Sequence, residues 1–87
     1  MKELLDIHIY TPEGVVFQGK AVSAKFPGAK GSFAVLPQHA PIISLLTAGK
    51  IVCQQEEQPP VEISIKGGFV EVKKNVISAC VETGNKR

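Results

Sequence analysis

The sequence predicts an all-β protein, an antiparallel β-sandwich of about ten short strands in two sheets. Apolar residues recur at every second position through most of the chain, which is the period of a strand with one buried face. Turn-forming Gly, Pro and Asn residues separate these runs at short intervals. The eight glycines and six prolines also leave few windows long enough for a helix.

Alternation defines the expected strands in chain order. Leu5, Ile7 and Ile9 alternate with more polar residues. The same pattern recurs in residues 21–26, 51–54, 61–66 and 70–73. Residues 76–81 are apolar on both faces except at Ser78, which predicts a central or doubly covered strand. The expected turns lie at residues 12–14, 19–20, 27–31, 48–50, 58–60, 66–68 and 74–75.

The apolar residues that follow Pro41 do not alternate. Ile42 and Ile43 are adjacent, and Ser44 separates them from Leu45 and Leu46. This run fits a buried strand or a short helical turn. The alternative is an exposed patch that contacts a partner.

Length and composition limit what the chain can be. Its 87 residues form one domain, residues 1–87, with a modest core, and we expect about residues 84–87 to be a flexible tail. A net charge of +2 gives no electrostatic case for binding nucleic acid or an anionic membrane. The N-terminus lacks the apolar stretch of a signal peptide, and no apolar run approaches the roughly 20 residues that cross a bilayer. We therefore expect a soluble, intracellular protein without lipid insertion.

The cysteines and histidines show no metal-binding or redox spacing. Cys53 and Cys80 lie in apolar alternation, and nothing in the sequence suggests secretion. We therefore expect two reduced, buried thiols, with a disulfide as the alternative. His8 is expected on the exposed face of a strand and His39 in a loop.

Residues 14–21 match most of the phosphate-binding pattern G-x-x-x-x-G-K-[ST]. The pattern fails at Ala21, which replaces the hydroxyl that would ligate magnesium. The interior, Val15-Val16-Phe17, favours a strand, and the alternation after Lys20 excludes the helix that such a loop needs. We expect a strand flanked by glycines and no nucleotide binding by this chain. The sequence also lacks a nucleophile elbow, a carboxylate pair or a Cys–His arrangement, so we expect no catalysis and no cofactor.

Residues 33–41 contain several residues that restrict the conformation of the backbone. Pro37 and Pro41 exclude a helix, and each pushes the residue before it toward extended geometry. We expect a strand over residues 33–36 that leads into a rigid loop presenting His39. A rigid loop on a sheet scaffold commonly builds a contact surface.

Six motifs follow one another along the chain. They are Thr11-Pro12-Glu13-Gly14 with Val16-Phe17 and Gly19, Pro27-Gly28-x-x-Gly31-x-Phe33, Val35-Leu36-Pro37-x-His39-Ala40-Pro41, Gly49-Lys50-Ile51, Ile65-x-Gly67-Gly68-Phe69-x-Glu71-Val72 and Asn75-Val76. Together they cover nearly the whole chain, and their order resembles the epsilon subunits of F-type ATP synthases, which are called delta in mitochondria.

The resemblance implies a non-catalytic place in the central stalk. There the subunit links the gamma subunit to the ring of c subunits, within the alpha/beta/gamma/delta/epsilon complex. Proton-driven rotation is thereby coupled to ATP synthesis. The implied location is the cytoplasmic face of the bacterial plasma membrane, as a peripheral protein.

The resemblance also assigns partner contacts. The residues expected to face the gamma subunit are Thr11, His39 and Ser44. The residues expected to reach the polar loops of the c-ring are Lys30, Gly31 and Ser32. To the gamma contacts we add Ile42, which would be an apolar anchor if it is exposed.

The chain departs from the family pattern in a few places. Ala34 stands where the family usually has Gly, and Gln38 where it often has Asn. Family members continue into a C-terminal helical hairpin that can inhibit ATP hydrolysis. Residues 82–85 start no helix, so we expect this chain to have no C-terminal helical domain and no inhibition through one, either as a naturally short subunit or as a fragment of a longer one.

One alternative function belongs to another class, a free-standing β-sandwich module that binds a carbohydrate or an oligonucleotide. Such a module needs exposed aromatic side chains. We expect four of the five aromatics in the core, namely Phe17, Phe26, Phe33 and Phe69.

Overall fold

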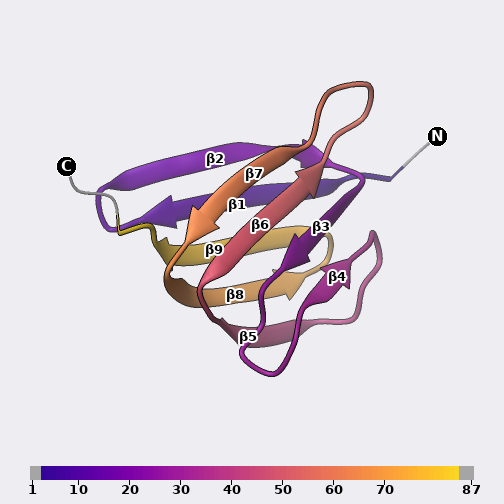
Figure 1. Ribbon diagram of the computed structural model, residues 1–87. Helices are drawn as coiled ribbons and strands as arrows, with labels where there is room; N and C mark the ends of the chain where they lie inside the picture. Colours follow the sequence, from indigo (N-terminus) through magenta and orange to yellow (C-terminus); the bar gives the residue numbers. More distant parts are fainter. Residues whose placement is uncertain (1–2, 85–87) are drawn as a thin grey trace.

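The structure, a computed structural model, describes residues 3–84 and contains nine β-strands (Figure 1). The strands are β1 (Leu5–Thr11), β2 (Gly14–Ala21), β3 (Ser23–Phe26), β4 (Phe33–Val35), β5 (Ile42–Leu46), β6 (Gly49–Gln54), β7 (Val61–Ile65), β8 (Gly67–Lys73) and β9 (Val76–Glu82). Within these residues no helix is long and apolar enough to cross a membrane. Most of the tail expected at residues 84–87 lies outside the described residues.

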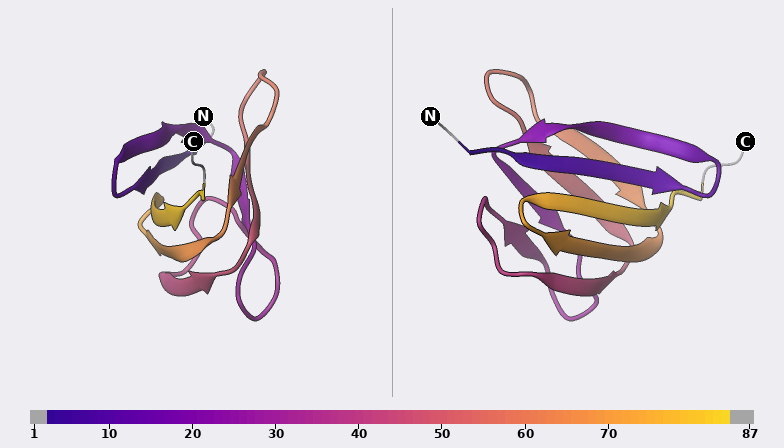
Figure 2. Two further views of the ribbon diagram at one scale, coloured as in Figure 1. Left: turned by 60° about the vertical axis from the view of Figure 1, so that its left-hand side comes forward. Right: turned by 180° about the vertical axis from the view of Figure 1, so that it is seen from behind.

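The strands form two sheets that pack face to face (Figure 2). One sheet has five strands in the order β2-β1-β9-β8-β5, and the other has four in the order β4-β3-β6-β7. The chain passes between the sheets after β2, β4, β5 and β7. The expected two-sheet sandwich is confirmed, and the strand over residues 76–81 is central, since β9 lies between β1 and β8.

The sandwich is not wholly antiparallel, because β1 and β9 pair in parallel. The first and last strands are distant in sequence, and no tight turn joins them. Each belongs to its own antiparallel hairpin, β1–β2 or β8–β9, and these hairpins do not fix the direction of β1 relative to β9. Alternation shows which face of a strand is buried but carries no information on its direction, so the sequence did not reveal this pair.

The core lies between the inner faces of the two sheets. Strand β1 contributes Leu5, Ile7 and Ile9, all fully buried, as the alternation predicts. Phe26 is also fully buried and stacks on Phe33 with ring centroids 5.7 Å apart. The other buried apolar residues are Ala21, Ala24, Val35, Leu46, Ile51, Cys53, Ile65, Val70, Val72, Ile77, Ala79 and Val81.

Backbone hydrogen bonds tie the two sheets together along the β5 side. The Ala29 N–H donates to the Leu45 carbonyl at 3.0 Å, and the Thr47 N–H donates to the Pro27 carbonyl at 2.8 Å. Gly28 is required there because a Cβ at this position would lie 2.6 Å from the Gly31 carbonyl oxygen. These contacts fix the β3–β4 loop beside β5.

Candidate partner-binding surface

The register of the five-stranded sheet aligns apolar side chains in one row on its outer face. Tyr10 of β1 pairs with Val15 of β2 and with Cys80 of β9. Phe69 of β8 pairs with Cys80 and with Leu45 of β5. We call these five residues the apolar row. It crosses every strand of the sheet.

The apolar row is open to solvent in the described structure. Leu45 is 68% exposed, Val15 65%, Phe69 49% and Tyr10 37%, while Cys80 is half-buried. Single exposed apolar residues are ordinary, but a contiguous apolar patch on a soluble domain marks an interaction site. The row is therefore the strongest candidate for a docking surface on this chain.

The other half of the same face is mainly polar. His8 and Glu71 each pair with Ser78 in the next register row. Beyond them, the Asp6 carboxylate lies 3.3 Å from the His8 Nε2 and 4.0 Å from the Lys20 ammonium. The outer face is thus divided across its strands. The apolar half lies toward the end of β1 and the charged half toward its beginning.

The apolar run that follows Pro41 forms strand β5. Residues 42–46 form an extended strand with alternating burial, neither fully buried nor helical. Ile43 and Leu45 project to solvent, with 76% and 68% of their surface exposed. Ile42 is half-buried and packs against the core. Ile42 therefore does not meet the condition of exposure on which its role as an anchor depends, whereas Ile43 and Leu45 have the exposure that an anchor needs.

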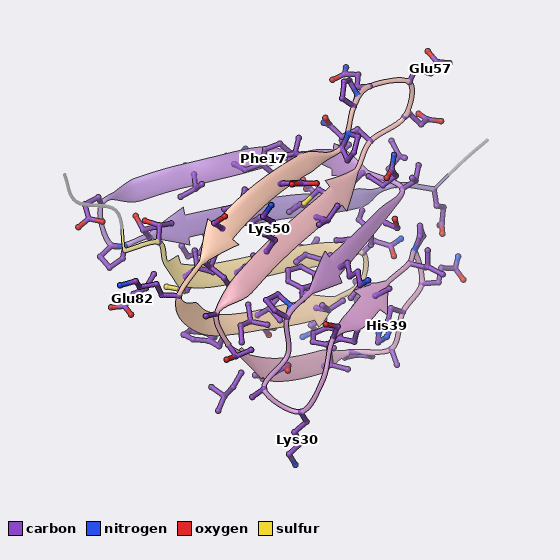
Figure 3. All side chains as sticks on the ribbon, in the orientation of Figure 1. Phe17, Lys30, His39, Lys50, Glu57 and Glu82 are labelled. Carbon is purple, nitrogen blue, oxygen red and sulfur yellow. The ribbon has the colours of Figure 1, made fainter. Side chains whose placement is uncertain are left out.

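The loop between β4 and β5 is a compact turn. The His39 N–H donates to the Leu36 carbonyl at 3.1 Å. The His39 Nδ1 lies 2.7 Å from the Ala40 carbonyl oxygen, and the side chain is half-buried. This loop presents His39 at the end of the sandwich where β5 begins (Figure 3).

The residues expected to reach the c-ring lie in the β3–β4 loop. Lys30, Gly31 and Ser32 are all exposed, and the Lys30 side chain extends away from the body of the protein (Figure 3). The Gly31 N–H donates to the Gly28 carbonyl at 3.0 Å, which closes the loop into a turn. A groove of about 320 Å³ lies between this loop and β5 and is lined on the strand side by Ile43, Ser44 and Leu45.

Thr11 is not close to His39. It ends β1, on the far side of the sheet from the β4–β5 loop (Figure 1). The Thr11 hydroxyl donates to the Glu13 carboxylate and accepts from the Glu13 N–H, both at 3.1 Å. Thr11 follows Tyr10 and so lies beside the apolar row. The structure therefore gathers Ser44 with Lys30 and Gly31 and sets Thr11 and His39 at opposite ends.

The remaining chemical candidates are the phosphate-loop-like segment and the Cys and His side chains. The phosphate-loop-like segment is the extended strand β2, as expected. Among residues 3–84 no three His, Cys, Asp or Glu side chains are grouped to hold a metal ion. Both cysteines are free thiols. Cys53 is fully buried as expected, and burial raises its pKa from 9.0 to about 11, whereas Cys80 is only half-buried.

Most of the apolar row is not evident from the sequence alone, and the expectation that Phe69 lies in the core is wrong. Phe17, Phe26 and Phe33 do pack in or against the core, but Phe69 projects outward. The signal was present in the alternation of β8. Because Val70 and Val72 point inward, Phe69 must share the outer face with Glu71.

The chain matches a family model described as the ATP synthase delta/epsilon chain, beta-sandwich domain, over residues 4–86. It is 37% identical over 82 residues to an ATP synthase epsilon chain of Moorella thermoacetica, covering 94% of this chain and 61% of that one. It is 42% identical over 80 residues to an ATP synthase epsilon chain of Nitratiruptor, covering 92% and 62%. The chain thus spans about three-fifths of the length of these curated relatives.

Solved structures support the fold. A chain in the mitochondrial ATP synthase of Euglena gracilis (OSCP/F1/c-ring) superposes with a TM-score of 0.83 at 18% identity, covering 90% of this chain and 50% of that one. A chain in the central stalk and c-ring of the Tetrahymena thermophila mitochondrial enzyme gives 0.75 at 14% identity, covering 93% and 65%. The family-model match and the sequence relatives together establish that this chain belongs to the ATP synthase delta/epsilon family, in its β-sandwich domain.

Proposed function

We propose that this chain is a non-catalytic rotor subunit that links the gamma subunit of an ATP synthase to its c-ring. In that role it transmits ion-driven rotation to the sites of ATP synthesis. Its place would be peripheral, at the cytoplasmic face of a bacterial plasma membrane. The chain itself needs no cofactor for this, because its task is mechanical coupling.

The apolar row is the observation that carries the proposal. A rotor subunit must hold its partner firmly through each rotation, and buried apolar contacts supply most of the stability of such interfaces. The row offers a rigid sheet face, with the paired residues Phe69 and Leu45 at its β5 end. We assign this face to the gamma subunit, with Thr11 at its edge.

The residues around β5 supply the second partner site. Lys30, Gly31 and Ser32 are exposed in the β3–β4 loop, and the Lys30 side chain projects beyond β5 (Figure 3), where it is free to contact the polar loops of the c-ring. Ser44 lines the groove between this loop and β5, so it lies between the two proposed contacts. His39 would meet the gamma subunit from the β4–β5 loop.

One observation favours the alternative function of oligonucleotide binding, and another argues against it. Tyr10 and Phe69 are exposed aromatics on one face, as a stacking platform requires. Their neighbours in the row are Val15, Cys80 and Leu45, and the adjacent row contains His8, Ser78, Glu71 and Ile43. Neither row contains Lys or Arg, so the two aromatics have no neighbouring cation that could follow a nucleic-acid backbone. Lys20 and Lys73 lie in the next row of the same face, where Lys20 is near the Asp6 carboxylate.

The proposal is tested by affinity purification of the tagged chain from detergent-solubilised membranes of its native cell. We expect the gamma and c subunits to be recovered, together with alpha and beta. A Leu45→Asp/Phe69→Asp variant should lose the gamma subunit, because two charges would then be placed in an apolar interface. A folded wild-type chain that recovers none of these subunits would refute the function.

A further inference from the structure

The two-residue turn between β8 and β9 contacts two other parts of the chain. Lys74 and Asn75 both have left-handed φ angles, of 52° and 65°, between the paired residues Lys73 and Val76. This is the geometry of a type I′ hairpin turn, in which Asn is favoured. The turn explains why residue 75 tolerates a left-handed backbone, but it does not explain the contacts of its side chain.

Asn75 joins three segments that are distant in sequence. Its side-chain Oδ1 accepts a hydrogen bond of 2.6 Å from the Gln38 backbone N–H, 37 positions away. Its backbone carbonyl accepts a hydrogen bond of 2.8 Å from the Asp6 N–H. The β8–β9 turn is therefore bonded both to the start of β1 and to the β4–β5 loop.

The bonded part of that loop is a type II turn. The His39 N–H donates to the Leu36 carbonyl, Pro37 occupies the second position, and Gln38 occupies the third with φ at 70°. A type II turn prefers Gly at the third position, because a residue with a Cβ is disfavoured at positive φ. A type I turn would suit Pro37-Gln38 without positive φ. The two forms differ by a flip of the peptide between Pro37 and Gln38, which reverses the direction of the Gln38 N–H.

We propose that Asn75 is a positioning residue that holds the Leu36–His39 turn in its type II form and thereby directs His39 toward the gamma subunit. The Asn75 Oδ1 accepts the Gln38 N–H in the orientation that the type II turn gives it, and a flipped peptide would point that N–H away. A second bond, from the Gln38 Nε2 to the Glu3 carboxylate at 2.7 Å, holds the Gln38 side chain. The choice of gamma as the partner rests on the function proposed above.

Three variants distinguish the hydrogen bond of the Asn75 side chain from the part that residue 75 plays in the β8–β9 turn. Asn75→Gly keeps the left-handed hairpin turn but removes the acceptor. Asn75→Asp keeps both the acceptor and a residue suited to the turn. The double variant Asn75→Gly/Gln38→Gly also lacks the acceptor, but a glycine at position 38 adopts positive φ unaided and should restore the type II turn.

Two measurements report on the proposal, namely amide exchange at residue 38 by NMR and the dissociation constant for isolated gamma subunit. In Asn75→Gly we expect exchange of the Gln38 amide to accelerate about tenfold and binding of gamma to weaken about tenfold, the effect of one lost hydrogen bond. Asn75→Asp should stay within about twofold of wild type in both. The double variant should recover gamma affinity although its melting temperature remains that of Asn75→Gly, because its turn and not its overall stability has been restored.

The proposal is overturned if Asn75→Gly leaves the Gln38 amide as protected as in wild type. It is also overturned if the amide is exposed but gamma binds as tightly as before, or if the double variant fails to recover affinity. A wild-type chain that does not bind gamma would instead refute the proposed function. In that case the exchange measurement still decides whether Asn75 holds the turn.

Discussion

Leu45 of β5 and Phe69 of β8 are direct cross-strand partners, and both side chains project from the outer face of the five-stranded sheet into solvent. Cross-strand apolar pairs of this kind contribute only about 0.2–1 kcal/mol to the sheet itself. Leu45 is 68% exposed and Phe69 49%, so a large share of their apolar surface is available for a partner to bury. The Leu45–Phe69 pair is thus both a part of the sheet and a part of the surface proposed to bind the gamma subunit.

Removing either member of this pair should weaken partner binding without unfolding the protein. We expect Leu45→Ser or Phe69→Ser to cost about 1–3 kcal/mol of gamma-subunit affinity, or roughly 5- to 150-fold in the dissociation constant. The free energy of unfolding should change by no more than about 1 kcal/mol, because both side chains are already half or more exposed. Calorimetric titration and urea denaturation measure the two effects.

Lys25→Ser is the matched control for that experiment. Lys25 is also an exposed, long side chain, but it lies on β3 in the other sheet. Its replacement should leave gamma affinity within about twofold of wild type, an effect of under about 0.5 kcal/mol. Equal losses from Lys25→Ser and Leu45→Ser would show that the outer face of the five-stranded sheet is not the docking surface.

Ile42 and Ile43 are adjacent in sequence, but truncation should lower the stability of the protein much more at Ile42 than at Ile43. Ile42→Ala removes a half-buried side chain that packs on the core, and we expect it to lower the free energy of unfolding by about 1–3 kcal/mol. For a domain of this size that lowers the melting temperature by roughly 5–20 °C.

Ile43→Ala serves as the control, since 76% of the Ile43 surface is exposed. It should change stability by less than about 0.5 kcal/mol. Thermal unfolding followed by circular dichroism distinguishes the two variants. A larger loss from Ile43→Ala than from Ile42→Ala would contradict the orientation of β5.

Much of this fold follows from local sequence. The alternation in β1 predicts that Leu5, Ile7 and Ile9 are buried, and all three are. The apolar run of β9 predicts a central strand, which is what the sheet order shows. Both predictions depend only on side chains within one strand, where the period of two is a direct physical signal.

The surface was harder to predict because it depends on register between strands. Tyr10, Cys80 and Phe69 belong to strands from both ends of the chain, and they form one row only because β1 and β9 pair in parallel. No local pattern specifies that pairing. The same limit applies to Asn75, whose contact with Gln38 spans 37 positions.

Gly68 and Gly14 share a backbone conformation, and we expect replacement by alanine to be tolerated less well at Gly68. Gly68 and Gly14 have φ angles of 146° and 144°, so each incurs a similar strain penalty when given a Cβ. At Gly14 that Cβ would meet nothing within 4 Å, but at Gly68 it would overlap the Cys80 carbonyl oxygen in the neighbouring strand. We expect Gly14→Ala to cost about 1–3 kcal/mol of unfolding free energy and Gly68→Ala clearly more. Similar costs in urea denaturation would mean that β8 and β9 are not as close as the structure places them.

The buried Cys53 thiol should make the protein less stable in alkali. Burial raises its pKa from 9.0 to about 11, so the folded state holds the proton more tightly than the unfolded state does. Between pH 9 and 11 the unfolded chain therefore binds fewer protons, and the free energy of unfolding falls as the pH rises. The contribution is fully present below pH 9, and on the order of 2 kcal/mol should be lost across this interval.

Other groups also titrate in this range, so the measurement is a difference between variants. Cys53→Ala will be less stable at neutral pH because a core side chain is truncated, but its stability should fall less steeply from pH 9 to pH 11. Cys80→Ala removes the half-buried thiol of the outer face and retains Cys53, so it is the matched cysteine control. Urea denaturation of the three proteins at pH 8, 9.5 and 11 gives the slopes directly. If Cys53→Ala and wild type lose stability in parallel, the Cys53 thiol is not held in its protonated form by the core.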